Sequence, residues 1–117
     1  MNDKETYAPL SLFEYDHRPG SYCLMLTDAQ MGGASGVFAE HGLEESGYGW
    51  AGVARAVLAR DPGLENRLGL DPEAGMFVAY GDDLDALRTL AASLHEAIHD
   101  HAKLSELIKA GDPEWFD

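Results

Sequence analysis

Residues 76–102 read MFVAYGDDLDALRTLAASLHEAIHDHA, and this stretch decides the fold class. Its first five residues are an apolar run that predicts a strand at Met76–Tyr80. Asp82 and Asp83 follow where acidic side chains cap free backbone N–H groups and complement the helix dipole. From Leu84 to Ala102, apolar residues recur along one side of a helical wheel and polar residues along the other. The stretch therefore predicts a strand followed by a long amphipathic helix that lies on a sheet.

Three further strands are predicted upstream. Leu68–Asp71 reads as a strand that the turn residues 72–75 join to Met76–Tyr80, which makes a hairpin. Near the start, Leu10–Tyr15 and Ser21–Thr27 flank a Pro-Gly turn and predict a second hairpin. Its second arm is apolar without alternation, as expected for a strand that is covered on both faces or central in the sheet.

Two more helices complete the predicted order. Trp50 opens an apolar helical face that continues at Val53, Ala54, Val57 and Leu58 until Asp61-Pro62-Gly63 stops it, and we expect Trp50 in the core. The glycine-rich segment 30–49 predicts a loop with one brief helix at residues 35–41. Leu104, Leu107 and Ile108 either extend the long helix or form a last short one.

The grouping of hairpins and helices predicts the α+β class. We expect an antiparallel sheet of about four strands, in two hairpins, with helices packed on one face. The chain has 117 residues, 45% of them hydrophobic, which predicts a single domain over residues 1–117. The tail residues Trp115 and Phe116 either fold back over the core or stand out as a hydrophobic anchor.

Composition and charge exclude several classes of partner and location. Eight Lys and Arg against 21 Asp and Glu leave a net charge of −13, which repels phosphate backbones and anionic lipid, so we expect no nucleic acid and no membrane partner. No apolar run approaches the roughly 20 residues of a spanning helix. A polar start without a signal peptide and a single cysteine, Cys23, predict a cytoplasmic protein.

One motif could carry catalysis. His95-Glu96-Ala97-Ile98-His99 matches H-E-x-x-H, in which two histidines bind zinc and the glutamate is the base for a metal-bound water. The extended form of the motif requires Gly at 102 and His at 105, where this chain has Ala102 and Ser105. We therefore expect no metal and no cofactor, and a small zinc-dependent hydrolase that uses His95, His99 and Glu96 remains the alternative.

The remaining reactive residue types fit structural roles. Cys23 lies inside an apolar strand, where a thiol has a raised pKa and behaves as a small hydrophobe. The segment 32–36 is glycine-rich but lacks the lysine and the spacing of a phosphate-binding loop. We therefore expect no catalytic residues.

Two exposed acidic groups favour a protein contact instead. Glu44, Glu45 and Tyr48 precede the Trp50 helix in the glycine-rich segment, and aromatic and acidic side chains together suit a basic protein partner. Asp82, Asp83 and Asp85 form the acidic start of the long helix. These six residues are the predicted partner-binding set.

Two stretches carry a family resemblance: residues 38–50, FAEHGLEESGYGW, and residues 71–80, DPEAGMFVAY. They resemble immunity protein family 51 of bacterial polymorphic toxin systems, and the resemblance is strongest over residues 35–98. It implies a small cytoplasmic α+β protein that neutralises, by binding, a cognate toxin encoded by a neighbouring gene, and it brings no active-site residues. Because many such toxins act on nucleic acid and are basic, the implied target is a nuclease-like effector.

Other classes stay open at this point. Besides the zinc hydrolase, the chain could be a scaffold or ligand-binding domain of unrelated purpose. We expect a monomer or a weak homodimer, because no pattern in the sequence requires self-association.

Overall fold

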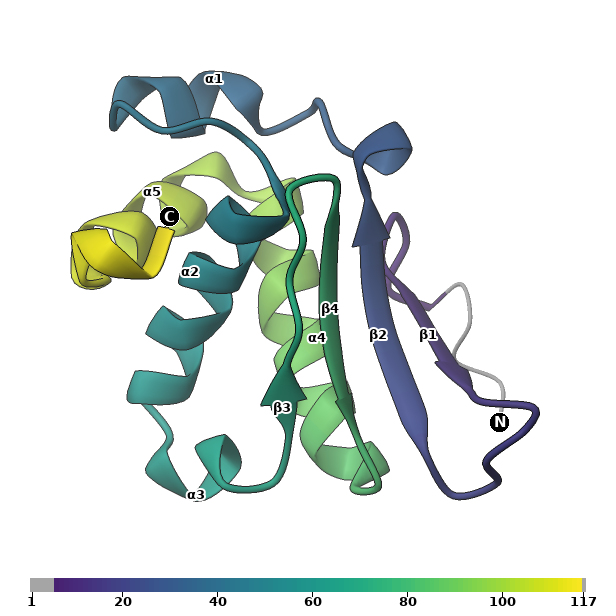
Figure 1. Ribbon diagram of the computed structural model, residues 1–117. Coiled ribbons are helices and arrows are strands. Elements are labelled where there is room, and N and C mark those ends of the chain that lie inside the picture. Colours follow the sequence, from purple (N-terminus) through teal and green to yellow (C-terminus); the bar gives the residue numbers. More distant parts are fainter. Residues whose placement is uncertain (1–5, 117) are drawn as a thin grey trace.

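The computed structural model describes residues 6–116, which contain one four-stranded sheet (Figure 1). The strands are β1 (Ser11–Glu14), β2 (Tyr22–Thr27), β3 (Gly69–Leu70) and β4 (Met76–Gly81). They lie in the order β1-β2-β4-β3, and every neighbouring pair is antiparallel. Both predicted hairpins are confirmed, and β2 is central in the sheet, as its continuous apolar pattern predicted.

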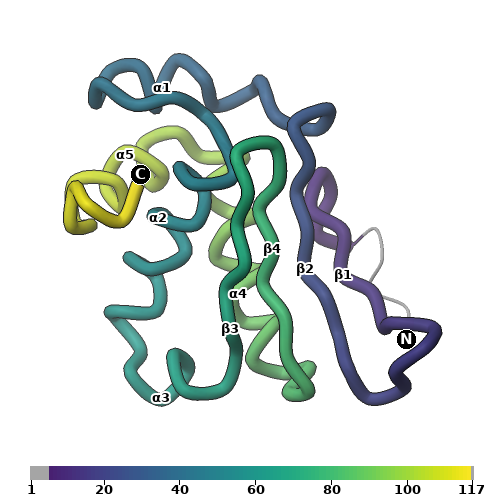
Figure 2. Tube along the Cα trace, in the orientation of Figure 1, coloured from purple at the N-terminus to yellow at the C-terminus, as the bar shows by residue number. Residues whose placement is uncertain are grey.

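Five α-helices lie within residues 6–116, and together with the sheet they confirm the α+β class. They are α1 (Ser35–Glu40), α2 (Gly47–Ala59), α3 (Pro62–Glu65), α4 (Leu84–His99) and α5 (His101–Ala110). Short 3-10 turns lie at Asp28–Gln30 and Pro113–Phe116. Helix α4 packs on β1, β2 and β4, and α2 packs on β4, α4 and α5. The tube view shows α2 and α4 on one side of the sheet (Figure 2).

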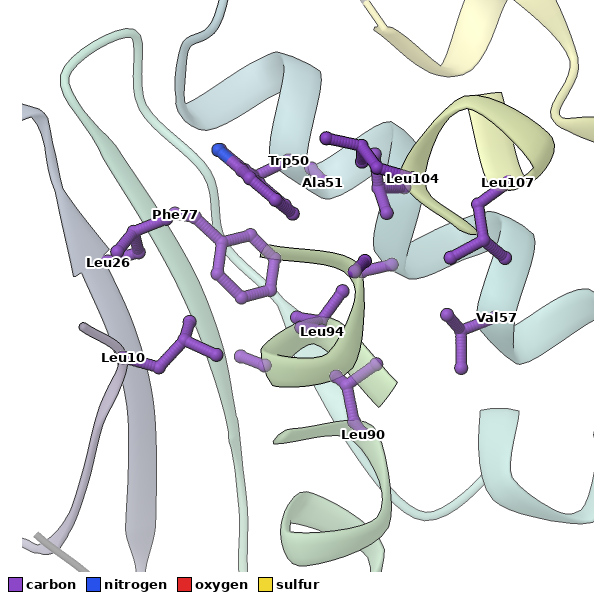
Figure 3. Packing of buried hydrophobic residues seen from close by; sticks show 14 of the residues in the cluster. Leu10, Leu26, Trp50, Ala51, Val57, Phe77, Leu90, Leu94, Leu104 and Leu107 are labelled. Carbon is purple, nitrogen blue, oxygen red and sulfur yellow. The ribbon is translucent and has the colours of Figure 1, made fainter. Parts of the chain in front are cut away.

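The core lies between this inner face of the sheet and the helices. Directly paired residues of an antiparallel sheet share a face, and Leu12, Leu24 and Ala79 are paired in this way and fully buried. The ring of Phe77 points from β4 toward Leu94 of α4 (Figure 3). Burial of these apolar side chains joins the helices to the sheet and is the main stabilising contribution to the fold.

The opposite face of the sheet has no helix over it within residues 6–116 (Figure 1). We call it the outer sheet face and define it by Phe13, Cys23, Met25, Val78 and Tyr80, which the strand pairing places on one side. Cys23 and Val78 are buried by their neighbours, Phe13 and Met25 are partly buried, and Tyr80 is 46% exposed. At these five positions the outer sheet face is apolar.

The predicted long helix ends at His99, so its predicted extent to Ala102 is wrong. Leu104, Leu107 and Ile108 lie in a separate last helix, which is one of the two possibilities that the sequence left open. Asp100 has extended backbone angles, φ −135° and ψ 96°, between α4 and α5. Its carboxylate accepts hydrogen bonds from the backbone N–H of Ala102 at 3.1 Å and of Lys103 at 3.4 Å, so it caps α5. An aspartate that bonds nearby backbone competes with a continuous helix. The break lets α5 pack against α2.

The tail folds back over α2. Phe116 is 6% exposed, and a Cβ added at Gly52 would lie 2.3 Å from its ring, so the ring lies directly on the backbone of the helix. The carbonyl oxygen of Trp115 accepts a hydrogen bond from Arg55 at 3.1 Å. The sequence left open whether Trp115 and Phe116 fold back over the core or stand out, and in the structure they fold back.

Helix α2 begins against the β3–β4 turn because a glycine permits the approach. A Cβ at Gly47 would lie 1.7 Å from the carbonyl oxygen of Glu73 and 2.3 Å from that of Met76. Ser46 caps the helix by accepting a hydrogen bond from the N–H of Gly49 at 3.0 Å. The indole of Trp50 is 1% exposed, as predicted, and meets the Phe38 ring edge-on at 5.4 Å.

We predict that Gly47→Ala lowers the free energy of unfolding by about 2–3 kcal/mol or more, because the added methyl group overlaps backbone oxygens that cannot move independently. Gly36→Ala is the matched control, since nothing lies within 4 Å of its Cβ position. A helical Gly→Ala change at such a site is neutral or stabilising by up to about 1 kcal/mol. Urea denaturation followed by circular dichroism measures both, and equal stabilities of the two variants would contradict the close approach.

Candidate protein-binding surface

Glu45, predicted as a partner contact, is held by three hydrogen bonds within the fold. One carboxylate oxygen accepts from the N–H of Gly32 at 2.7 Å and from the hydroxyl of Ser35 at 3.0 Å. The other accepts from the indole N–H of Trp50 at 3.0 Å. The side chain therefore ties the glycine-rich segment before α1 to the first turn of α2, and its role as a partner contact stays a prediction.

Glu44 and Tyr48 lie beside these hydrogen bonds of Glu45 and face solvent. Both are exposed, and Tyr48, at 40%, is one of two large hydrophobic side chains that are this exposed within residues 6–116. Gly47 donates a backbone hydrogen bond to the carbonyl of Ala74 at 3.0 Å, which places Tyr48 next to the β3–β4 turn. Their position is compatible with contact to another protein.

The second acidic group lies at the start of α4. Asp83 caps this helix, accepting from the N–H of Ala86 at 3.1 Å, and it also pairs with the Arg67 guanidinium at 2.6 and 3.1 Å. The bonds from Arg67, with that from Ala86, hold the pKa of the Asp83 carboxyl below its usual value. Asp82 and Asp85 are exposed, and Asp85 lies 3.7 Å from Arg88. Asp83 is therefore engaged within the fold, whereas Asp82 remains directed to solvent.

The structure does not bring the two predicted groups together. Glu44 and Tyr48 lie near the first residue of β4, and Asp82 follows its last residue. A strand of six residues spans about 17 Å at 3.4 Å per residue. The two groups therefore lie at opposite ends of β4, and the outer sheet face lies between these ends.

The histidines and the glutamate of the H-E-x-x-H motif lie on different sides of α4. The rings of His95 and His99 lie 4.5 Å apart, and His95 also meets Tyr7 edge-on at 6.3 Å. Glu96 pairs instead with Lys103 of α5 and lines a cavity of about 310 Å³ that neither histidine lines. Within residues 6–116, no group of three or more His, Cys, Asp or Glu side chains is arranged to hold a metal ion.

Cys23 is shielded on the outer sheet face. The thiol is 1% exposed, and burial raises its pKa, an effect that a hydrogen bond to Tyr15 partly offsets. The same hydrogen bond, with burial, raises the pKa of Tyr15 to about 12. A protonated, buried thiol is a poor nucleophile, so the structure agrees with the predicted role of Cys23 as a small hydrophobe.

Tyr80 is the exposed aromatic residue that the sequence reasoning did not select. It stands at the end of the apolar run Met76–Tyr80, which predicts a strand but does not show which of its side chains face outward. The register pairs it with Cys23 and with Gly69, and this pairing places it on the outer sheet face. Strand alternation places Tyr80 on the face opposite Phe77 and Ala79, but the sequence alone does not show which of the two faces the helices cover.

Fold and surface together define a small α+β protein that exposes two aromatic side chains, Tyr48 and Tyr80, at or beside the sheet. Within the same residues 6–116, no helix is long and apolar enough to cross a bilayer. The chain matches the family model described as Immunity protein 51 over residues 10–113, and it belongs to this family. The match includes the first hairpin, beyond the resemblance seen in the sequence. Comparison with curated proteins and with solved structures gave no match.

We predict that Glu45→Ala lowers the free energy of unfolding by about 1–3 kcal/mol, because the indole N–H of the buried Trp50 loses its acceptor. Glu44→Ala, one position away and exposed, changes it by less than about 0.5 kcal/mol. Chemical denaturation compares the two variants. A Glu45→Ala variant as stable as the wild type would show that the three hydrogen bonds contribute nothing to the fold.

The Asp83–Arg67 pair predicts a dependence of stability on pH. Because the pKa of Asp83 is lower in the folded state, the pair stabilises the fold fully above the unfolded-state pKa near 4, and this contribution is lost as the pH falls through the lower folded-state pKa. We expect Asp83→Asn to melt at a lower temperature than the wild type at pH 7, with a difference that shrinks as the pH falls below about 4. Asp82→Asn is the control, and an Asp83→Asn difference that stays constant as the pH falls would contradict the assignment.

Proposed function

We propose that this protein binds a cognate toxin and neutralises it without chemical turnover, which protects the cell that produces both. Membership of the Immunity protein 51 family is the observation that carries the proposal. The partner is a protein encoded beside it in a polymorphic toxin system, and the encounter takes place in the cytoplasm. A nuclease-like effector fits best as the toxin, because its surface must attract phosphate.

The charge of the chain supports a basic partner. A net charge of −13 over 117 residues gives a field that speeds association with a positively charged protein. Rapid capture suits an inhibitor that has to meet its toxin before the toxin meets its substrate. The same field repels nucleic acid, so the protein acts on the toxin and not on what the toxin cleaves.

The arrangement of the H-E-x-x-H motif supports inhibition by binding. Glu96 is paired with Lys103 and lies away from the two histidines, whose rings meet edge-on, so the three side chains do not form one catalytic group. Neutralisation by occupying the toxin surface requires no such group.

We predict that co-expression with the toxin encoded beside it restores growth, and that the two proteins elute from a sizing column as one complex. Glu96→Gln retains full protection, because the proposal gives this residue no chemical role. Continued killing by the toxin with no complex formed would overturn the proposal. Loss of protection in a folded Glu96→Gln variant that still binds the toxin would show that neutralisation needs turnover.

A further inference from the structure

The outer sheet face presents an exposed aromatic side chain held in a fixed position. A Cβ added at Gly69 would lie 2.5 Å from the Tyr80 ring, so the ring lies directly over the backbone of β3. Tyr80 is nevertheless 46% exposed. A tyrosine that is already ordered loses little conformational entropy on binding, and tyrosine is among the residue types that dominate binding energy at protein interfaces.

Around Tyr80 the face is apolar and partly hollow. Cys23 is paired directly with Tyr80 and with Phe13, and Val78 is paired with Met25. Cys23 and Val78 are buried, whereas Phe13 and Met25 are partly buried. At the end of the sheet, a hollow of about 520 Å³ is lined by residues from the β1–β2 turn and from the end of β4, namely Tyr15, His17, Arg18, Ser21, Tyr22, Tyr80, Gly81 and Asp82. An apolar centre with an adjacent hollow is the arrangement in which partner side chains become fully desolvated.

Carboxylates surround this apolar centre. Asp71 continues β3, and its N–H is bonded to the carbonyl of Val78 at 2.9 Å. Its negative charge contributes to the raised pKa of Tyr15. Glu73 pairs with Met76 at one end of β4, and Asp82 lines the hollow at the other end. All three carboxylates are exposed, and Arg18 in the β1–β2 turn is the cation that lines the hollow with Asp82. These three carboxylates and Arg18 form the rim of the apolar centre, and the rim therefore carries a net negative charge.

We propose that the outer sheet face is the surface on which the toxin docks, with Tyr80 as its central aromatic contact and the surrounding carboxylates facing a basic patch of the toxin. This inference rests on the proposed function and names the surface that performs it. It also connects the two ends of β4 where the predicted residues Tyr48 and Asp82 lie.

A second copy of this chain fits the same face poorly. Two copies in contact would place the carboxylates of Asp71, Glu73 and Asp82 opposite like charges, and each copy carries a net charge of −13. Like charges placed opposite one another across an interface oppose association. A basic protein removes this repulsion and is therefore the occupant that the face favours.

The test measures toxin binding by surface variants against matched controls. Tyr80→Lys is expected to weaken the affinity for the purified, catalytically inactive toxin about 30-fold or more, the loss that defines a dominant contact. Ala92→Lys adds the same charge at an exposed position of α4 and is expected to stay within about threefold of the wild type. Tyr80→Phe keeps the ring and is expected to bind nearly as well as the wild type. Thermal unfolding confirms that each variant is folded.

Paired charge variants test the rim. Asp71→Asn with Glu73→Gln is expected to slow association about threefold or more and to reduce its dependence on salt. Glu40→Gln with Glu106→Gln removes the same two charges from exposed positions of α1 and α5, and we expect a smaller effect on the association rate. Equal rates for the two pairs would show that only the total charge matters and would remove the rim from the interface.

The outcomes separate this inference from the proposed function. If the wild type neither binds nor neutralises the toxin, the proposed function fails. If the wild type neutralises the toxin while folded Tyr80→Lys binds with unchanged affinity, the docking face alone is wrong. A dimer of the purified protein that Tyr80→Lys dissociates, with toxin binding unaffected, would assign the face to a second copy and would also overturn the inference.

Discussion

The packing of β4 against the helices behind it, centred on Phe77, is the interaction on which the rest of the structure depends. Phe77 is fully buried in one cluster with Trp50 and Leu94, so a single strand is joined to α2 and α4 at once (Figure 3). Both helices therefore lie on the same side of the sheet. The other side keeps apolar residues and has no helix over it within residues 6–116, and this asymmetry leaves open the surface on which we propose that the toxin docks.

Much of the fold could be predicted because local patterns and tertiary packing agree. Strand runs, the Pro-Gly turn and the apolar face that begins at Trp50 each point to the element that forms. The division of the long helix could not be predicted from periodicity, because the apolar positions continue through Asp100 into Leu104. What decides it is the side chain of Asp100, which bonds to the backbone of the next turn and leaves its own backbone extended.

The candidate site was predictable only in part, because the contacts of its side chains depend on the tertiary arrangement. Composition and charge identify acidic residues near turns and helix starts, but they do not show which carboxylates the fold itself uses. Glu45 and Asp83 bind internal donors, which only the tertiary arrangement reveals. Tyr80 was missed because strand runs do not show by themselves which face a helix will cover. The proposed docking surface is thus a face of the sheet that no helix covers within residues 6–116.

Hydroxyl-radical footprinting of the free protein and of its complex with the toxin reports which face the toxin covers. If the toxin docks on the outer sheet face, oxidation of Tyr80 and Met25 falls strongly in the complex, because both lie on that face. Trp115, which is partly exposed beside α2, is predicted to react equally in both states. Protection of Trp115 with unchanged reactivity of Tyr80 and Met25 would contradict the account and place the toxin on the helical side.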